Sequence, residues 1–137
     1  MISSGFLLKG STCRIVTLSG SKRKHSQIAN KFHKLELGSK PTQEDVAVFI
    51  QALLAYCSDY SVETIIINQR TSRGTHAGGS ATFRIEGIIL ASSPVLIKQV
   101  HPATIRATDR NKPKLKTSKP DTIDLGKAYD LAFEGLD

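Results

Sequence analysis

The stretch at residues 65–79 constrains the fold more than any other part of the sequence. It begins with three consecutive isoleucines, residues 65–67, and continues as a polar, basic segment punctuated by glycines. β-Branched side chains pack well in a strand that is buried on both faces. In an α/β protein the crevice beyond the carboxyl end of such a strand is the usual place for a site. The polar residues that follow the strand are therefore candidates for a binding site. They are Asn68, Gln69, Arg70, Arg73, Thr75 and His76.

The N-terminal part of the chain has the patterns of an antiparallel sheet. Residues 2–8 and 12–18 are predicted to be the two strands of a hairpin with a tight turn at Gly10. Residues 19–24 are polar and basic and indicate a turn region. The alternation of residues 32–37 predicts a third, edge strand. The fourth strand is the isoleucine stretch, at residues 64–68.

The helices and the last strand follow from apolar spacing and end signals. Thr42 and Asp45 predict the start of a helix, with Thr42 as its cap. Its apolar residues then recur every three or four positions, which predicts one face packed on a sheet. They are Val46, Phe49, Ile50, Leu53, Leu54 and Cys57.

The C-terminal part is predicted to alternate helices and strands. A second helix is expected at 77–90, a fifth strand at 95–100, a short helix with Pro102 at its first position, and a loop at 107–120. The last helix, at 122–135, has Asp121 as candidate cap, and its candidate apolar contacts are Ile123, Ala128, Leu131 and Ala132. The order β-β-β-α-β-α-β-α predicts an α/β fold with a mixed sheet and helices packed on it.

Length and composition indicate one domain over residues 1–137 in a soluble, cytoplasmic protein. The longest mainly apolar stretch, 46–56, is too short to span a membrane, and the N-terminus lacks the regions of a signal peptide. Cys13 and Cys57 have neither a metal-ligand spacing nor a disulfide framework, so reduced thiols are expected. The sequence does not indicate an oligomeric state.

The charge balance indicates a polyanionic partner. Nineteen Lys and Arg residues against twelve acids give a net charge of +7 and a pI near 9.6, which attracts nucleic acid, an acidic protein face or anionic lipid. One cluster comprises Arg106, Arg110, Lys112, Lys114, Lys116 and Lys119. Lys22, Arg23 and Lys24 form a second cluster, and Arg70 with Arg73 a third. The alternatives are a basic protein without such a partner and, for the 106–119 run, a mobile solvated loop.

Other site chemistries have little support. The histidines at positions 25, 33, 76 and 101 have no ligand spacing with one another or with the cysteines. Ser72 and His76 lack a nucleophile-elbow motif, and residues 70–75 lack the P-loop signature. No cofactor is therefore expected.

The element order is shared with ribonuclease H and the RuvC Holliday-junction resolvases, and specific residues strengthen the resemblance. Residues 5–10 (Gly-Phe-Leu-Leu-Lys-Gly) resemble the opening strand and turn. Gln69-Arg70, Gly74, Ala77-Gly78-Gly79, Phe83, Glu86 and residues 102–107 resemble a family of bacterial RuvC-like proteins. The resemblance implies a ribonuclease H-like fold over nearly the whole chain.

The resemblance also implies where catalytic acids would stand. Active members of the superfamily hold two divalent ions with acids from the first strand, the end of the fourth strand and the last helix, because hard Mg²⁺ prefers oxygen anions. Here those strand positions are Leu7 and Gln69. The remaining acids are Glu86, Asp121 and Asp124, for which a salt-bridged helix residue (Glu86) and helix capping (the aspartates) are the alternative roles.

Three functional hypotheses follow. The first is a catalytically degenerate RuvC-like domain that binds structured nucleic acid through a basic cleft. Its phosphate contacts would be Arg70, Arg73, Arg106, Arg110, Lys112 and Lys114, with Gln69 and His76 as polar contacts. The second is a protein-interaction module, of the inhibitor or immunity type, with a basic face that docks on an acidic partner. The third is a residual Mg²⁺-dependent nuclease that uses Glu86, Asp121 and Asp124.

Overall fold

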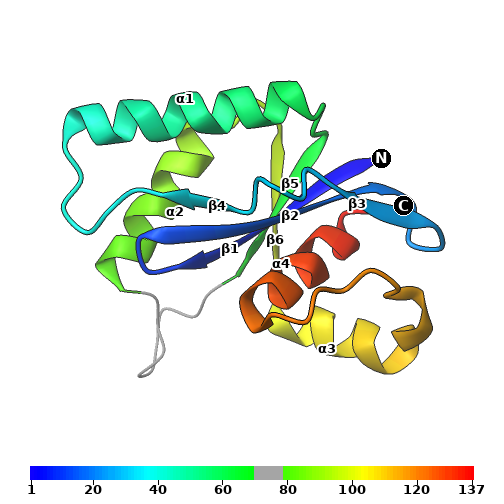
Figure 1. The fold of residues 1–137 in the computed structure, drawn as a ribbon. Helices are drawn as coiled ribbons and strands as arrows, with labels where there is room; N and C mark the ends of the chain where they lie inside the picture. The colour runs from blue at the N-terminus through cyan, green and yellow to red at the C-terminus, as the bar shows by residue number, and fades with distance from the viewer. Residues whose placement is uncertain (70–78) are drawn as a thin grey trace.

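A computed structural model describes residues 1–69 and 79–137 and contains one mixed sheet with helices on both faces (Figure 1). The strands are β1 (Ile2–Lys9), β2 (Thr12–Gly20), β3 (His25–Ile28), β4 (Lys34–Glu36), β5 (Thr64–Asn68) and β6 (Leu96–Val100). The helices are α1 (Gln43–Asp59), α2 (Ser80–Ser92), α3 (Pro102–Asn111) and α4 (Ile123–Glu134), with a short 3₁₀ turn, η1, at Pro113–Leu115.

The sheet has the order β3-β2-β1-β5-β6, and β4 also pairs with β2. β1 and β2 form the predicted antiparallel hairpin, in which Phe6 faces Ile15 in the register. β5 lies parallel to β1 and to β6, with Phe6 opposite Ile67 on one side and Asn68 opposite Val100 on the other. The predicted mixed α/β sheet is therefore confirmed.

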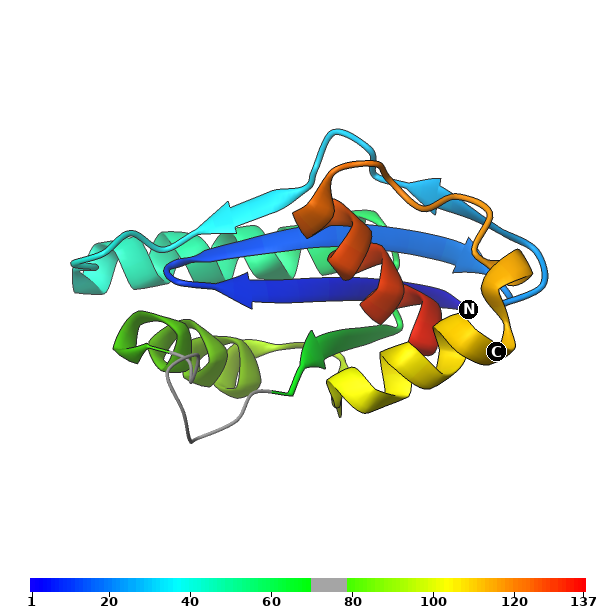
Figure 2. The same ribbon diagram turned by 90° about the horizontal axis from the view of Figure 1, so that it is seen from below.

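One face of the sheet is covered by α1 and α2 (Figure 2). α1 begins with the predicted capping box, in which the Thr42 hydroxyl accepts from the amide of Asp45 and the Asp45 carboxylate accepts from the amide of Thr42. Its buried residues are Phe49, Leu53, Tyr56 and Cys57, so the predicted stripe is rotated slightly toward Tyr56. These side chains pack with Phe6, Ile15, Ile65 and Ile67 from the strands and with Ile85 and Ile89 from α2.

The opposite face is covered by α4, which crosses β1 and β2 and also contacts β5 (Figure 2). Its buried side chains Ala128, Tyr129, Ala132 and Phe133 pack on Val16 and Leu18 of β2. Gly5 in β1 permits this close approach, because a Cβ at Gly5 would lie 1.9 Å from the carbonyl oxygen of Ala128. The two chain ends lie close together (Figures 1 and 2), and the amides of Gly20 and Lys22 donate to the carbonyl oxygens of Met1 and Asp137.

Several boundaries differ from the sequence expectations. The predicted third strand at 32–37 is only Lys34–Glu36, and a further strand at His25–Ile28 pairs with the other half of β2. Between the two segments Ala29 has a φ of 57°, a left-handed conformation that interrupts an extended edge. The expected loop at 107–120 is partly helical, since α3 continues to Asn111 and is followed by η1.

The start of the last helix also differs. Its N-cap is Thr122, not Asp121, and no side chain caps it by a hydrogen bond. Ile123 is 74% exposed, so its predicted role as an apolar contact is wrong, whereas Ala128, Leu131 and Ala132 are buried as predicted. The second helix begins at Ser80 and ends at Ser92, and its predicted first residue, Ala77, lies outside the described residues.

None of the helices in the described part of the chain has the length and apolar surface that a bilayer crossing requires.

Candidate functional site

A cavity of about 360 Å³ lies where the parallel strands end, and we call it the strand-end cavity. β1 contributes Leu7, the end of β5 contributes Asn68 and Gln69, and the end of β6 contributes Val100. The other walls come from the first turns of α3 and from the middle of α4. They are Pro102, Ile105, Arg106, Lys127, Asp130 and Leu131. The position matches the expectation that a site lies beyond the carboxyl ends of central strands.

The wall of the strand-end cavity is largely apolar, with a few polar groups. The Asn68 side chain is fixed in place because its Oδ1 accepts a hydrogen bond of 3.0 Å from the amide of Leu8. This bond leaves the Asn68 amide nitrogen as a donor at the cavity. Gln69 is exposed at the mouth. The cavity thus combines apolar surface with amide donors, which is the usual composition of a small-ligand site.

The charged side chains that line the strand-end cavity differ in whether they already have an ionic partner. Asp130 is buried, and both of its carboxylate oxygens are held by lysines, Oδ1 by Lys116 at 2.8 Å and Oδ2 by Lys119 at 3.0 Å. Arg106 and Lys127 are exposed, and no acid in the described part of the chain pairs with either. Among the described residues that line the cavity, the charged side chains without an ionic partner are therefore two cations.

Lys116 is the centre of this ionic network. Its side chain is only 5% exposed and contacts Asp109 at 2.5 Å as well as Asp130. Burial lowers the pKa of Lys116, but the hydrogen bonds that it donates to Asp109 and Asp130, together with the charges of these acids, outweigh burial, so the pKa is raised. Lys116 and Lys119 therefore hold the segment after α3 onto α4 and are not free to bind an external anion.

The residues in the strand-end cavity do not fit a pair of divalent ions. Leu7 has no ligand atom, and Lys127 would repel a cation in the same space. Among residues 1–69 and 79–137, no group of three or more His, Cys, Asp or Glu side chains could hold a metal ion.

The three acids that a residual nuclease would use are also dispersed. Glu86 belongs to α2, on the sheet face opposite α4, where its Oε1 accepts from Nε2 of Gln99 at 3.4 Å. Asp124 is in the first turn of α4, with its carboxylate 3.5 Å from Nζ of Lys9. Asp121 is exposed and precedes α4. The described structure does not bring these acids together.

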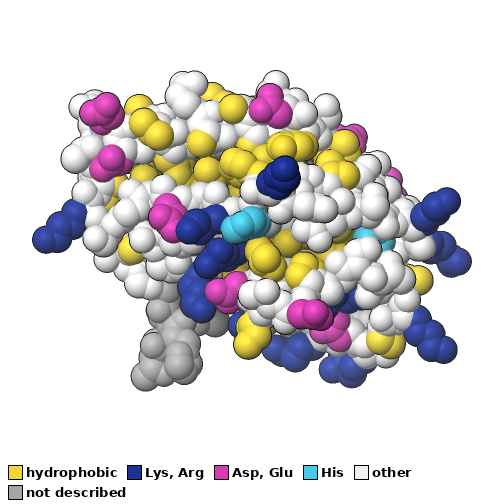
Figure 3. Space-filling model, in the orientation of Figure 1, with side chains coloured by type: hydrophobic (Ala, Val, Ile, Leu, Met, Phe, Trp, Pro, Cys, Tyr) yellow, Lys and Arg dark blue, Asp and Glu magenta, His cyan; other side chains and the backbone are white. Residues whose placement is uncertain are grey.

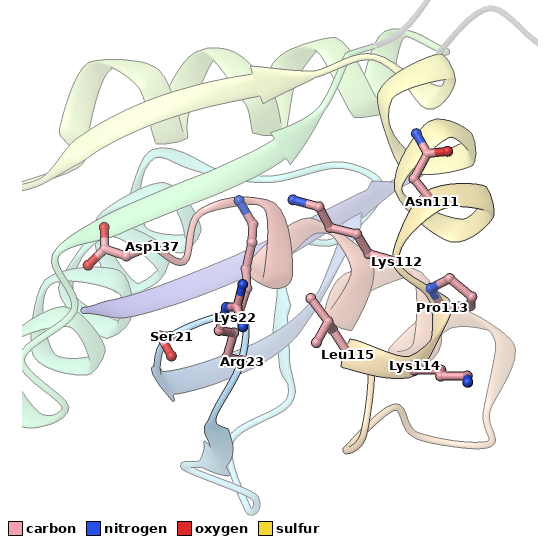
Figure 4. Close-up of a pocket in the computed structure, with 9 residues that line it drawn as sticks. All are labelled: Ser21, Lys22, Arg23, Asn111, Lys112, Pro113, Lys114, Leu115 and Asp137. Carbon is pink, nitrogen blue, oxygen red and sulfur yellow. The ribbon is translucent and has the colours of Figure 1, made fainter.

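A second, larger hollow of about 810 Å³ lies at the other end of α3, and we call it the basic groove (Figure 4). The turn between β2 and β3 contributes Ser21, Lys22 and Arg23. The end of α3 and the 3₁₀ turn contribute Asn111, Lys112, Pro113, Lys114 and Leu115, and Asp137 completes the lining. In Figure 4 the side chains of Lys22 and Lys112 extend toward one another, whereas Lys114 extends outward.

The turn that carries Lys22 and Arg23 is anchored by a histidine. Nδ1 of His25 lies 3.0 Å from the carbonyl oxygen of Ser21, and Nε2 lies 2.7 Å from the hydroxyl of Tyr129 in α4. Burial raises the pKa of the Tyr129 hydroxyl, so Tyr129 stays neutral and can donate to His25. The turn that forms one wall of the basic groove is therefore held in place by α4. The end of α3 forms the other wall.

The binding residues expected from sequence fall in both places. Gln69 and Arg106 line the strand-end cavity, Lys112 and Lys114 line the basic groove, and Arg110 is exposed on α3 between them. Arg70, Arg73 and His76 lie outside the described residues. Sequence reasoning missed Lys127, although its spacing from Leu131 and Asp130 in one helix was a usable signal. It also did not indicate that Lys22 and Arg23 face Lys112.

Comparison with protein families identifies the family of this chain. The family model described as "Protein of unknown function (DUF3010)" matches residues 1–135, and the chain belongs to this family. No curated protein matches the sequence.

Solved structures resemble the chain over nearly its whole length. RuvC of T. thermophilus in complex with a Holliday junction substrate has a TM-score of 0.74 at 12% identity, and covers 97% of this chain and 90% of its own. The Thermus thermophilus RuvC structure has a TM-score of 0.74 at 12% identity, and the match covers 97% of this chain and 92% of that chain. The Fowlpox virus resolvase in complex with Holliday junction DNA has a TM-score of 0.55 at 11% identity, and the match covers 98% of this chain and 95% of that chain. The predicted RuvC-like, ribonuclease H-like fold is therefore confirmed.

Proposed function

We propose that this member of the DUF3010 family is a single-domain nucleic-acid-binding protein that contacts the phosphates of a duplex or branched substrate through one basic face. The basic face comprises Arg106, Arg110, Lys112 and Lys114 with Lys22 and Arg23. Phosphate contacts of this kind give affinity and position without reading sequence.

The observation that carries the proposal is the meeting of two cationic segments in the basic groove. Lys22 and Arg23 are about ninety residues from Lys112 and Lys114 in sequence, yet all four line one hollow. Among the described residues of its lining, Asp137 is the one acidic side chain. In Figure 3, Lys and Arg side chains gather along the edge of the molecule that carries α3. Cations from two segments that converge on a hollow can follow a phosphate backbone.

The length of α3 suits a duplex. Its ten residues span about 15 Å, roughly the axial rise of four to five base pairs. Arg106 lies in the middle of α3 and Lys112 follows its last residue, about 9 Å further along the axis, so the two can contact neighbouring phosphates of one strand.

The fold relatives favour branched DNA as the first substrate to test, because two of the similar structures contain Holliday junctions. The strand-end cavity supports binding without two-metal hydrolysis, since Leu7 and Lys127 line it and Glu86, Asp121 and Asp124 are dispersed. We therefore assign to this chain the role of a binder that recognises nucleic-acid structure.

The test is a fluorescence-anisotropy titration with duplex DNA, a four-way DNA junction and duplex RNA, at several salt concentrations with Mg²⁺ present. Binding should weaken steeply with salt and leave the probes intact. The double variant Lys22→Gln/Lys112→Gln should reduce the slope of log K against log salt by about 1.8, that is, about 0.9 for each lost phosphate contact. Lys31→Gln/Lys40→Gln removes two exposed lysines away from the groove and is the matched control.

Three outcomes would contradict the proposal. Binding that is absent even at low salt would favour the alternative, an acidic protein partner on the same basic face. Equal slopes for the two double variants would place the contacts elsewhere. Mg²⁺-dependent cleavage that is lost in Asp121→Asn/Asp124→Asn would favour a nuclease that uses these acids.

A further inference from the structure

The strand-end cavity has a charge pattern that the basic groove does not share. Arg106 comes from α3 and Lys127 from α4, and both line the same hollow with no acidic partner among the described residues. Asp130 is the acid among the described lining residues, and its two carboxylate oxygens accept hydrogen bonds from Lys116 and Lys119. The unpaired charges of Arg106 and Lys127 make the cavity positive, which favours the binding of an anion.

The neutral residues that line the cavity indicate which kind of anion would fit it. Asn68 presents its amide nitrogen, because its oxygen is bonded to the amide of Leu8, and Gln69 offers a second amide at the mouth. Leu7, Val100, Ile105 and Leu131 form an apolar wall beside these donors. A bare inorganic anion would leave this wall without a partner, whereas a phosphate that carries an organic group would cover it. At about 360 Å³ the cavity has room for a group of that size.

The same residues explain why a divalent ion is not needed. In a two-metal site the ions neutralise the phosphate and the carboxylates hold the ions. Here Leu7 stands on the first strand, Gln69 directly follows β5, and the ammonium group of Lys127 from α4 lines the cavity. The lysine and the arginine can meet the phosphate oxygens directly, as charge-assisted donors.

We propose that the strand-end cavity binds one nucleotide phosphate directly on Lys127 and Arg106, without a divalent ion. The phosphate is a backbone phosphodiester of the nucleic acid, with the attached sugar on the apolar wall formed by Leu7, Ile105 and Leu131. This inference deepens the proposed function and rests on it for the source of the phosphate.

The experiment is an NMR titration of ¹⁵N-labelled protein with three probes: inorganic phosphate, thymidine 5′-monophosphate and a dinucleoside monophosphate. Each titration is run once in Mg²⁺ and once in EDTA. The dinucleoside monophosphate should cause saturable shifts of the backbone amides of Leu8, Asn68 and Leu131, equal in both buffers. Lys127→Gln should weaken that binding about tenfold, because a charged hydrogen-bond partner is lost. Lys31→Gln, an exposed lysine outside the cavity, should leave it unchanged.

The spectra of the variants report directly whether each is folded, so a loss of binding is separable from a loss of structure. Shifts that require Mg²⁺, shifts that Lys127→Gln leaves unaltered, or shifts confined to the basic groove would overturn the inference. Stronger binding of the monophosphate or of inorganic phosphate than of the dinucleoside monophosphate would show a free phosphate ligand and overturn the backbone assignment.

The anisotropy titration separates failure of this inference from failure of the proposed function. If duplex or junction binding depends on Lys22 and Lys112 but its salt slope is the same in Lys127→Gln and Lys31→Gln, only the inference fails. If the dinucleoside monophosphate binds the cavity but no duplex or junction binds at low salt, the proposed function fails instead. If both hold, Lys127→Gln lowers the salt slope by about 0.9.

Discussion

Nζ of Lys116 lies 2.8 Å from Oδ1 of Asp130, and both side chains are more than nine-tenths buried. Lys119 bonds to the other oxygen of Asp130, and Asp109 bonds to Lys116, so four charges are joined. The Lys116–Asp130 pair holds the segment after α3 against α4. It thereby fixes one wall of the basic groove and removes an acid from the charge balance of the strand-end cavity.

Replacement of Asp130 by Asn should destabilise the protein by about 3 kcal/mol, because Lys116 would keep its burial and lose its more buried partner. Urea denaturation followed by far-UV circular dichroism measures the change. The exposed Asp121→Asn is the control and should stay within about 0.5 kcal/mol of the unaltered protein. Addition of Lys116→Met to Asp130→Asn should restore part of the loss, and no restoration would argue against the pair.

Alkaline pH should lower the free energy of unfolding, because Lys116 loses its charge. The raised pKa of Lys116 means that its stabilising charge is fully present below the unfolded lysine pKa of about 10.4 and is lost as the pH rises through the folded value. The unfolding free energy of the unaltered protein should therefore fall more than that of Lys116→Met between pH 9 and 12. Tyrosine ionisation affects both proteins, so parallel pH curves would contradict this role of Lys116.

Substitution at Gly5 should reveal how close β1 and α4 lie. A Cβ there would meet backbone atoms of Ala128 and Ala132 at 1.9 and 2.5 Å, which cannot move aside without shifting α4. Gly5→Ala should cost about 3 kcal/mol or more in thermal or urea denaturation. Gly87→Ala, in α2 with nothing within 4 Å of the added atom, should instead stabilise by about 0.5–1 kcal/mol. Equal effects at the two glycines would refute the close contact.

Loss of the Tyr129 hydroxyl should loosen the turn that carries Lys22 and Arg23. Tyr129→Phe removes the bond to His25 and should cost about 1 kcal/mol of stability, with a several-fold loss of duplex affinity. Tyr60→Phe is the control, since its ring also packs on another aromatic ring, that of Tyr56, but its hydroxyl makes no hydrogen bond among the described residues. Anisotropy and urea titrations should separate the two variants, and identical behaviour would count against an anchoring role.

The two cysteines should be unreactive in the folded protein. Both are free and buried; burial raises the pKa of the Cys57 thiol to about 11 and that of Cys13 well above its usual value. Little thiolate is therefore present at pH 8. An aromatic disulfide reagent should modify both thiols promptly in urea and slowly in buffer, with Cys57→Ser to assign each rate. Equally fast modification in buffer would show that the interior opens readily.

The sequence predicted the elements whose signals are local. The isoleucines of β5, the β1–β2 hairpin and the capping box of α1 each show a pattern within a few residues, and the structure has all three. Leu7 and Gln69 were expected at one site from the family resemblance, and both line the strand-end cavity. The sequence failed where partners are distant: nothing local predicted that β3 and β4 would share β2 as a partner, or that Ile123 would be exposed.

Charge was the least predictable property at the level of single residues. The net charge of +7, the basic run after residue 105 and the isoleucine strand followed from the sequence alone, because these depend on composition and on short patterns along the chain. Tertiary packing sets which lysines are available to bind a partner. It buried Lys116 against Asp130, left Lys127 open in the strand-end cavity, and brought Lys22 to face Lys112. Ion pairing depends on distances in space between residues far apart in sequence, and the packing of α3 and α4 sets those distances.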